Sequence, residues 1–262
     1  MNYYDRFLVR IFADSEWVLK GGTMMLARVP DSRSTRDIDL FRTGYTAAES
    51  LERLRELAAV DLDDHFTFTF VSSEAIAAGD NQPYLDGVRV TFETYIGAQS
   101  VGTVKVDLVG GVVLTGTLVP YVPAYRLELR NVVIRDYQLY PLPDQIADKV
   151  CATVDTYSGR PSSRVKDGID LVVIARTQEG IKASELASAL THERGLRKLA
   201  AFDSFQLPIE WAGTYPRQAA QVAHCVDHRS LQAAQELMKQ FIDPILDATA
   251  TGVWRPAELV WR

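Results

Sequence analysis

The chain has 262 residues, of which 47% are hydrophobic, and its formal net charge is −6. This length and composition are enough for one large domain or two small ones with a packed core. No apolar run approaches the ~20 residues needed to cross a bilayer, and the first residues lack the basic-then-apolar order of a secretion signal, so we expect a cytoplasmic protein with no membrane partner. The acidic charge excludes a protein that binds nucleic acid over its whole surface, so any such contact must be local.

The first half of the chain mixes helix and strand patterns. Apolar residues at helical spacing predict helices over residues 2–13 and 46–59. Residues 17–19 have the pattern of a strand that runs into Gly21-Gly22, after which residues 23–27 are good helix formers. Further strands are expected over residues 37–41, 66–71, 88–96, 104–109 and 132–139. These elements predict an α+β fold in which a mixed sheet is flanked by helices.

The second half is predicted to be helical. Pro141 and Pro143 interrupt the chain, and Asp144 is suited to cap the helix that follows. We therefore place a domain boundary here, with one domain over residues 1–142 and a helical domain over residues 143–262. Its main helices are expected over residues 165–176, 183–192, 218–228 and 231–248.

Two histidines in the second half have the spacing of metal ligands. His224 and His228 are four residues apart and would share one face of a helix over residues 218–228. No third ligand is evident in the sequence. We therefore interpret the pair as ordinary helix surface.

Three aspartates are candidates for a metal site. Asp37 and Asp39 alternate along a strand, so their side chains point to one face with a rise of about 7 Å between them. Neighbouring carboxylates repel, and divalent cations relieve that repulsion; Mg²⁺ takes one or two carboxylates together with phosphate oxygens. The strand over residues 104–109 puts Asp107 opposite its apolar face, so the three acids converge if the strands pair. The alternative is that Asp37 and Asp39 lie on the wet face of an edge strand.

The Gly21-Gly22 pair is a candidate phosphate-binding turn. Bare backbone N–H groups and the positive end of a helix dipole can hold a triphosphate there, and Lys20 or Thr23 can add a contact. The alternative is a plain tight turn. The spacing of a P-loop is missing, which argues against an NTPase engine.

Two groups of basic residues offer local contacts for phosphate. They are Arg28, Arg33, Arg36 and Arg42 near the acids, and Arg160, Arg164 and Lys166 in the second half. A scattered, solvated surface is the alternative for each group.

Four segments, in order, resemble the AbiEii/MenT nucleotidyltransferase toxins of the polymerase-β-like superfamily. They are VLKGGT (18–23), STRDIDL (34–40), IADKV (146–150) and RVKDGIDL (164–171). The resemblance extends from near the start of the chain to about residue 176. It implies a minimal nucleotidyltransferase domain over residues 1–142, followed by a helical domain that contributes phosphate- and acceptor-binding residues to a site between the two.

The resemblance also implies an activity and partners. Members are toxins of bacterial toxin–antitoxin systems that take a nucleoside triphosphate, with CTP or UTP favoured, and add nucleotides to the 3′ acceptor end of tRNA. Translation is then blocked. The implied partners are the tRNA acceptor stem and a cognate antitoxin protein, and the implied cofactor is Mg²⁺.

The family motifs assign expected roles to the acids and glycines. Asp37 and Asp39 would hold Mg²⁺, and Asp107 would be a third ligand or the general base. Gly21 and Gly22 would lie against the triphosphate.

The same motifs assign roles in the second half and beside the first acid. Lys149 would bind phosphate and Asp167 would orient Lys149 or the nucleotide, whereas ordinary exposed helix charges are the alternative for both. Thr35 and Arg36 would lie beside the nucleotide. Thr35 stands where other members carry Ser, and its phosphorylation by the partner would add negative charge beside the acids.

Two other functions fit the same sequence. The acceptor can be a small molecule or a protein hydroxyl instead of tRNA, because fold does not decide the acceptor. The chain can also be a non-catalytic partner-binding module, although the intact acids argue against this.

Overall fold

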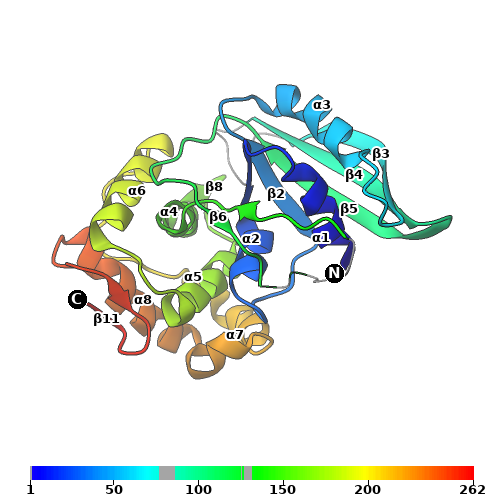
Figure 1. Ribbon diagram of the computed structural model, residues 1–262. Coiled ribbons are helices and arrows are strands. Elements are labelled where there is room, and N and C mark those ends of the chain that lie inside the picture. Colours follow the sequence, from blue (N-terminus) through cyan, green and yellow to red (C-terminus); the bar gives the residue numbers. More distant parts are fainter. Residues whose placement is uncertain (1, 77–85, 125, 127–131) are drawn as a thin grey trace.

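The computed structural model describes residues 2–76, 86–124, 126 and 132–262, and Figure 1 shows their arrangement. A five-stranded sheet with its flanking helices occupies one side of the molecule, and a group of helices occupies the other. This mixed architecture confirms the predicted α+β fold and the helical second half. Among the described helices, none has the length and apolar content needed to span a membrane.

The sheet has the strand order β1-β2-β5-β4-β3. β2 and β5 pair in parallel, and the other neighbours pair antiparallel, so the sheet is mixed as predicted. The strands are β1 (Trp17–Lys20), β2 (Asp37–Arg42), β3 (Phe66–Ala75), β4 (Gly87–Ile96) and β5 (Gln99–Val109).

One face of the sheet is apolar and covered by α1 (Asn2–Ile11) and α3 (Ala47–Ala58) (Figure 1). Period-two alternation sends the apolar residues of β2, β4 and β5 to this face, where they are buried. Phe7 of α1 packs on the rings of Phe68 and Phe92, with centroids 5.2 and 5.3 Å apart. The polar residues of the same strands therefore lie on the opposite face.

The second half is built around α4 (Leu142–Val154) and α5 (Val165–Thr177), which are buried along most of their length. The other helices here are α6 (Ala183–Leu196), the 3₁₀ helix η1 (Ile209–Gly213), α7 (Tyr215–Ala219), the 3₁₀ helix η2 (Ala223–His228) and α8 (Leu231–Leu246). Two short strand pairs complete it: β8 (Thr156–Tyr157) with β9 (Arg160–Pro161), and β10 (Trp254–Arg255) with β11 (Val260–Trp261). A third pair, β6 (Pro120–Tyr121) with β7 (Tyr137–Gln138), lies before residue 142. One hydrophobic core runs from the sheet into these helices. The sheet strands precede residue 142 and the long buried helices follow it, but the boundary there stays a prediction because the core is shared.

Three local expectations were wrong. Residues 218–228 do not form one helix, because the chain is extended at Val222 between α7 and η2. With about three residues per turn in η2, His224 and His228 do not share a face, and their rings lie near the carbonyl oxygens of Pro30 and Ala233. Within the described residues 132–139, only Tyr137–Gln138 is a strand.

Asp144 also differs from expectation. Pro141 is the residue that precedes α4, and Asp144 lies in the first turn of the helix. Its buried carboxylate accepts hydrogen bonds from the backbone N–H groups of Thr115 and Gly116, each at 3.2 Å. The acid therefore fastens the loop after β5 to the start of α4.

A buried ion cluster joins α1 to the loop before β3. Asp64 accepts from Arg6 Nε at 2.7 Å and from Arg10 NH2 at 2.7 Å, and all three side chains are almost fully buried. Burial alone would raise the pKa of Asp64, but the hydrogen bonds from the two guanidinium groups outweigh it and lower the pKa to about 2.

We predict that Asp64→Asn lowers the free energy of unfolding by about 3 kcal/mol at pH 7, because it leaves two buried guanidinium groups without their counter-ion. The folded-state pKa lies below the ordinary value, so the contribution of Asp64 is present above about pH 4 and is lost toward pH 2. Urea denaturation across this range measures it. Glu52→Gln, in an exposed pair with Arg55, is the control and should change little. Equal stability of Asp64→Asn and the wild type at pH 7 would contradict the prediction.

Candidate active site

The open face of the sheet carries a row of four charged residues on neighbouring strands. Lys20 of β1 is paired with Asp39 of β2, Asp39 with Asp107 of β5, and Asp107 with Arg89 of β4. Paired residues of adjacent strands point to the same face, so two carboxylates lie side by side between two cations. Asp37 lies two residues before Asp39 on the same face. The structure therefore brings Asp37, Asp39 and Asp107 onto one surface.

The Gly21-Gly22 turn lies directly against this row. Gly21 has a φ of +65°, and a Cβ added there would sit 2.0 Å from Oδ2 of Asp39. Only glycine allows the backbone to approach the carboxylate so closely in this conformation. The expected juxtaposition of the turn and the acids is thus present, at the start of α2 (Gly21–Arg28).

Two threonine hydroxyls tie the turn to β2. Thr23 Oγ1 donates to the carbonyl oxygen of Asp37 at 2.8 Å, and Thr35 Oγ1 donates to the same oxygen at 3.3 Å. A Cβ on Gly22 would lie 3.0 Å from Thr35 Oγ1. Both threonines therefore lie beside the turn. Their hydroxyl groups donate hydrogen bonds to the backbone carbonyl of Asp37.

Asp39 is the acid most perturbed by these surroundings. Burial is the main cause and the nearby Asp107 carboxylate the second, and together they raise the pKa of Asp39 to about 6. Lys20, Lys149 and Arg33 act in the opposite direction. Three cations from three separate segments thus face this carboxylate.

Asp107 is held by Arg89. Its Oδ1 accepts from Nε of Arg89 at 2.7 Å, and its Oδ2 accepts from NH2 at 2.7 Å. This two-point pairing occupies both oxygens and leaves the arginine half exposed at the rim of the row.

The acids fit magnesium as a pair. Across the described parts of the chain, no three His, Cys, Asp or Glu side chains gather closely enough to hold a metal ion by themselves. Mg²⁺ is usually held by one or two carboxylates plus substrate phosphate oxygens, so a three-ligand cage is not required. Asp37 and Asp39 can supply the two carboxylates, and a divalent cation would favour the ionised form of Asp39, whose pKa is raised first by burial and then by Asp107.

A second, buried charge cluster comes from the helical half. Lys149 Nζ of α4 donates to Asp167 Oδ1 and to Asp170 Oδ2 of α5, both at 2.7 Å. Arg164 also donates to Asp167. Asp170 is paired in addition with Arg33, which lies in the loop between α2 and β2. The structure thus brings Lys149 and Asp167 together, and it does so inside the protein and not on an exposed helix.

The protonation states in this cluster follow from the pairing. Burial favours the neutral amine of Lys149, but Asp167 and Asp170 outweigh it and raise the pKa above its ordinary value. Burial alone would raise the pKa of Asp167. Lys149 and Arg164 have a larger and opposite effect, so the pKa falls below its ordinary value. Lys149 is therefore a fixed positive charge at neutral pH.

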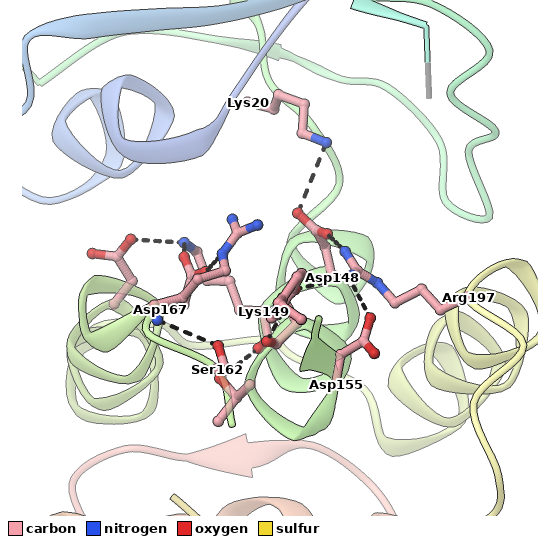
Figure 2. Close-up of polar contacts among 12 residues, drawn as sticks. Lys20, Asp148, Lys149, Asp155, Ser162, Asp167 and Arg197 are labelled. Atoms are coloured by element: carbon pink, nitrogen blue, oxygen red, sulfur yellow. Dashed lines mark hydrogen bonds and ion pairs between the residues drawn. The ribbon is translucent and has the colours of Figure 1, made fainter. Parts of the chain in front are cut away.

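Lys20 is held by a third buried acid. Its Nζ lies 3.8 Å from Oδ2 of Asp148, and Oδ1 of Asp148 accepts from NH2 of Arg197 at 2.6 Å. Figure 2 shows Lys20 reaching toward Asp148, with Arg197 on the other side of that carboxylate. Burial would raise the pKa of Asp148, but Lys20 and Arg197 outweigh it and lower it.

The four arginines that the sequence places near the acids lie in different surroundings in the structure. Arg36 is exposed beside the first acid, Arg28 packs over the ring of Tyr121, and Arg42 lies at the far end of β2. Only Arg33 enters the cluster at Gly22.

Four positions gained significance only in the structure: Arg33, Arg89, Asp148 and Asp170. Arg33 had been noted only as one of several basic residues. A signal existed for Asp170, because it lies one helical turn after Asp167 and shares its face. No pattern in the sequence pairs Arg89 with Asp107.

We predict that Asp39→Asn raises the free energy of unfolding at pH 7.5 by about 1 to 3 kcal/mol, because it removes a carboxylate whose pKa is raised by about two units. The pKa of Asp39 is higher in the folded state than in the unfolded state. The loss of folding stability caused by its ionisation is therefore full above about pH 6 and disappears near pH 4. Urea denaturation at pH 7.5 and 4.5 measures the difference. Asp61→Asn, in the exposed loop before β3, is the control. A loss of stability at pH 7.5 in Asp39→Asn would contradict this account.

A family model agrees with the motifs. The family model for the nucleotidyl transferase AbiEii toxin of type IV toxin–antitoxin systems matches residues 4–258. JHP933 from Helicobacter pylori has 16% identity and a TM-score of 0.47, covering 95% of this chain and 92% of that chain. Another H. pylori structure, provisionally described as a nucleotidyltransferase, has 16% identity and a TM-score of 0.48, covering 96% of both chains. No curated protein sequence matches. Because the family model spans nearly the whole chain, this protein belongs to the AbiEii family of nucleotidyltransferase toxins.

Proposed function

We propose that this toxin is a Mg²⁺-dependent enzyme that transfers nucleotides, preferably pyrimidine ones, from a nucleoside triphosphate to the 3′ acceptor end of tRNA. Family membership supplies the reaction class and implies an antitoxin partner. The observation that carries the proposal is the pairing of Asp39 with Asp107 beside the Gly21 turn, faced by the cations of Lys20, Lys149 and Arg33. A target in translation would place the activity in the cytoplasm.

The arrangement suits in-line phosphoryl transfer. The 3′-hydroxyl oxygen of the acceptor forms a bond to the α-phosphorus, the bond to the bridging oxygen of the β-phosphate breaks, and pyrophosphate leaves. Bound magnesium would neutralise charge on the phosphate oxygens, with Asp37 and Asp39 as its protein ligands. Lys20 and Lys149 would hold the β- and γ-phosphates, since each is a charged ammonium kept in place by a buried acid.

Asp107 is proposed to receive the proton of the attacking hydroxyl or to serve as a third ligand. Each oxygen accepts one hydrogen bond from Arg89 and keeps a second lone pair, so the pairing competes with either role without preventing it. Arg89 is half exposed and can turn outward toward an acceptor phosphate. The release of Asp107 would then accompany acceptor binding.

Thr35 is proposed as the point where the antitoxin silences the enzyme. Its hydroxyl lies beside Gly22 and the backbone of Asp37. A phosphate there would add nearly two negative charges next to the acids and would compete with the triphosphate. We expect mass analysis of toxin co-expressed with its genomic neighbour to show a phosphate on Thr35, and Thr35→Val to escape silencing. Silencing of Thr35→Val as fully as the wild type would exclude this mode of control.

The acidic net charge supports a second class of acceptor. A net charge of −6 favours a small molecule or a protein hydroxyl over a long nucleic-acid contact. A non-catalytic binding module is the third alternative and predicts no transfer at all.

The assay incubates the protein with Mg²⁺, each of the four labelled nucleoside triphosphates, and total tRNA or cell protein. We expect the label to enter tRNA, with CTP or UTP as the best donor. Asp37→Asn and Asp39→Asn should each reduce transfer by about 100-fold or more, since each removes a proposed metal ligand. Asp61→Asn, in the exposed loop before β3 and away from the acid row, is the matched control. Label in protein instead would support the second acceptor, and equal growth arrest by wild type and Asp39→Asn would support the binding module.

A further inference from the structure

We propose that Arg33 is an additional triphosphate-binding residue and that the buried Asp170 is the positioning residue that holds Arg33 and Lys149 on the same side of the Gly21-Gly22 turn. This inference rests on the proposed function and deepens it. It assigns binding of the triphosphate to two cations, Arg33 from the first half of the chain and Lys149 from the second.

Arg33 reaches the turn from the loop before β2. Its guanidinium nitrogens NH1 and NH2 both lie 3.1 Å from the point where a Cβ on Gly22 would sit. Any side chain at this position would therefore meet the guanidinium. Arg33 also contributes to the electrostatic environment of Asp39, the acid at the centre of the row. The arginine thus contacts the bare backbone of the turn at Gly22 and acts electrostatically on a proposed metal ligand.

Asp170 fixes the orientation of this arginine. Its Oδ1 accepts from Nε of Arg33 at 2.8 Å and its Oδ2 accepts from NH2 at 2.9 Å. The planar fork of an arginine is held in one orientation by such two-point pairing. The pairing uses one edge of the guanidinium and leaves NH1 on the side of Gly22.

The same carboxylate also holds Lys149. Its Oδ2 accepts from Lys149 Nζ at 2.7 Å, so one fully buried acid binds two cations that come from distant parts of the chain. A buried carboxylate is strongly disfavoured without counter-ions, and Arg33 and Lys149 are the counter-ions of Asp170. Asp167 binds Lys149 from the other side. Two of the three ammonium donors are then committed, and the position of Lys149 is fixed.

The charge of the cluster suits a polyanion. Three cations, Arg33, Lys149 and Arg164, share the two carboxylates of Asp167 and Asp170, which leaves one positive charge in this group. A fixed positive charge in a partly desolvated setting attracts phosphate more strongly than one in bulk water. Lys20, paired across the strands with Asp39, is a further cation and is itself held by Asp148. A triphosphate is a ligand whose negative charges these cations would attract.

The test measures binding of a non-hydrolysable nucleoside triphosphate and of the corresponding monophosphate, with Mg²⁺, by calorimetry on the full-length chain. A lost charged hydrogen bond corresponds to about a 10- to 100-fold change in affinity. We expect Arg33→Gln to weaken triphosphate binding by about this factor while monophosphate binding changes little. Arg33→Lys should recover part of the loss, because it restores the charge without the fork.

Asp170→Asn is the second variant. It should raise KM for the triphosphate and also lower kcat, because both Arg33 and Lys149 lose their fixed positions, whereas Arg33→Gln should act mainly on KM. Arg42→Gln is the matched control, since this arginine lies at the opposite end of β2 and pairs with Glu16 and Asp14. Thermal melting of each variant accompanies the binding data.

Unchanged triphosphate affinity in Arg33→Gln, with a lowered melting temperature, would overturn the inference and leave Arg33 a structural residue. If the wild type binds the triphosphate but labels no acceptor, the proposed function fails while the affinity comparison still decides the role of Arg33. If the wild type binds no nucleoside triphosphate, both proposals fall. Should Asp170→Asn not fold, Arg33→Gln and Arg33→Lys decide the matter alone.

Discussion

The carboxylates of Asp39 and Asp107 are held side by side on neighbouring parallel strands, and their repulsion is the constraint around which the site is arranged. The pairing of β2 with β5 keeps the backbones of Asp39 and Asp107 opposite each other, so neighbouring groups must offset the repulsion between the two carboxylates. Arg89 neutralises one acid directly, and Asp39 is left with a raised pKa and three cations at longer range. The fold thus keeps an incompletely neutralised acid beside a bare glycine turn, which is the pattern of a site that binds a cation and phosphate.

The cations that face Asp39 are themselves held by acids of the buried helices α4 and α5. Lys20 is anchored by Asp148, and Lys149 and Arg33 are anchored by Asp170. Buried ion pairs of this kind contribute little net stability, because the cost of desolvating the charges offsets their attraction. The shared hydrophobic core provides the stability, and the ion pairs determine where each positive charge stands. The helical half therefore contributes geometry to a site whose proposed metal ligands belong to the sheet.

Local patterns in the sequence were sufficient for most of the fold. Alternation predicted β4 and β5, and apolar spacing predicted α1 and α3, because each element buries one regular face. The sequence also predicted that Asp37, Asp39 and Asp107 share a face once the strands pair. It could not supply the register that sets Arg89 against Asp107, since register depends on packing between distant segments. The spacing puts Asp170 on the same helix face as Asp167, but it does not show that this face is buried or that Arg33 pairs with it.

The parallel pairing of β2 with β5 has a consequence for synthesis of the toxin. Parallel neighbours need a long connection, and here α3, β3 and β4 are made between them, so Asp39 can meet Asp107 only after β5 has been made. The anchoring acids on α5 are made later still. Contacts between segments so far apart in the sequence form slowly. The paired acids and the cations that face them are therefore complete only once both the sheet and the buried helices α4 and α5 have folded.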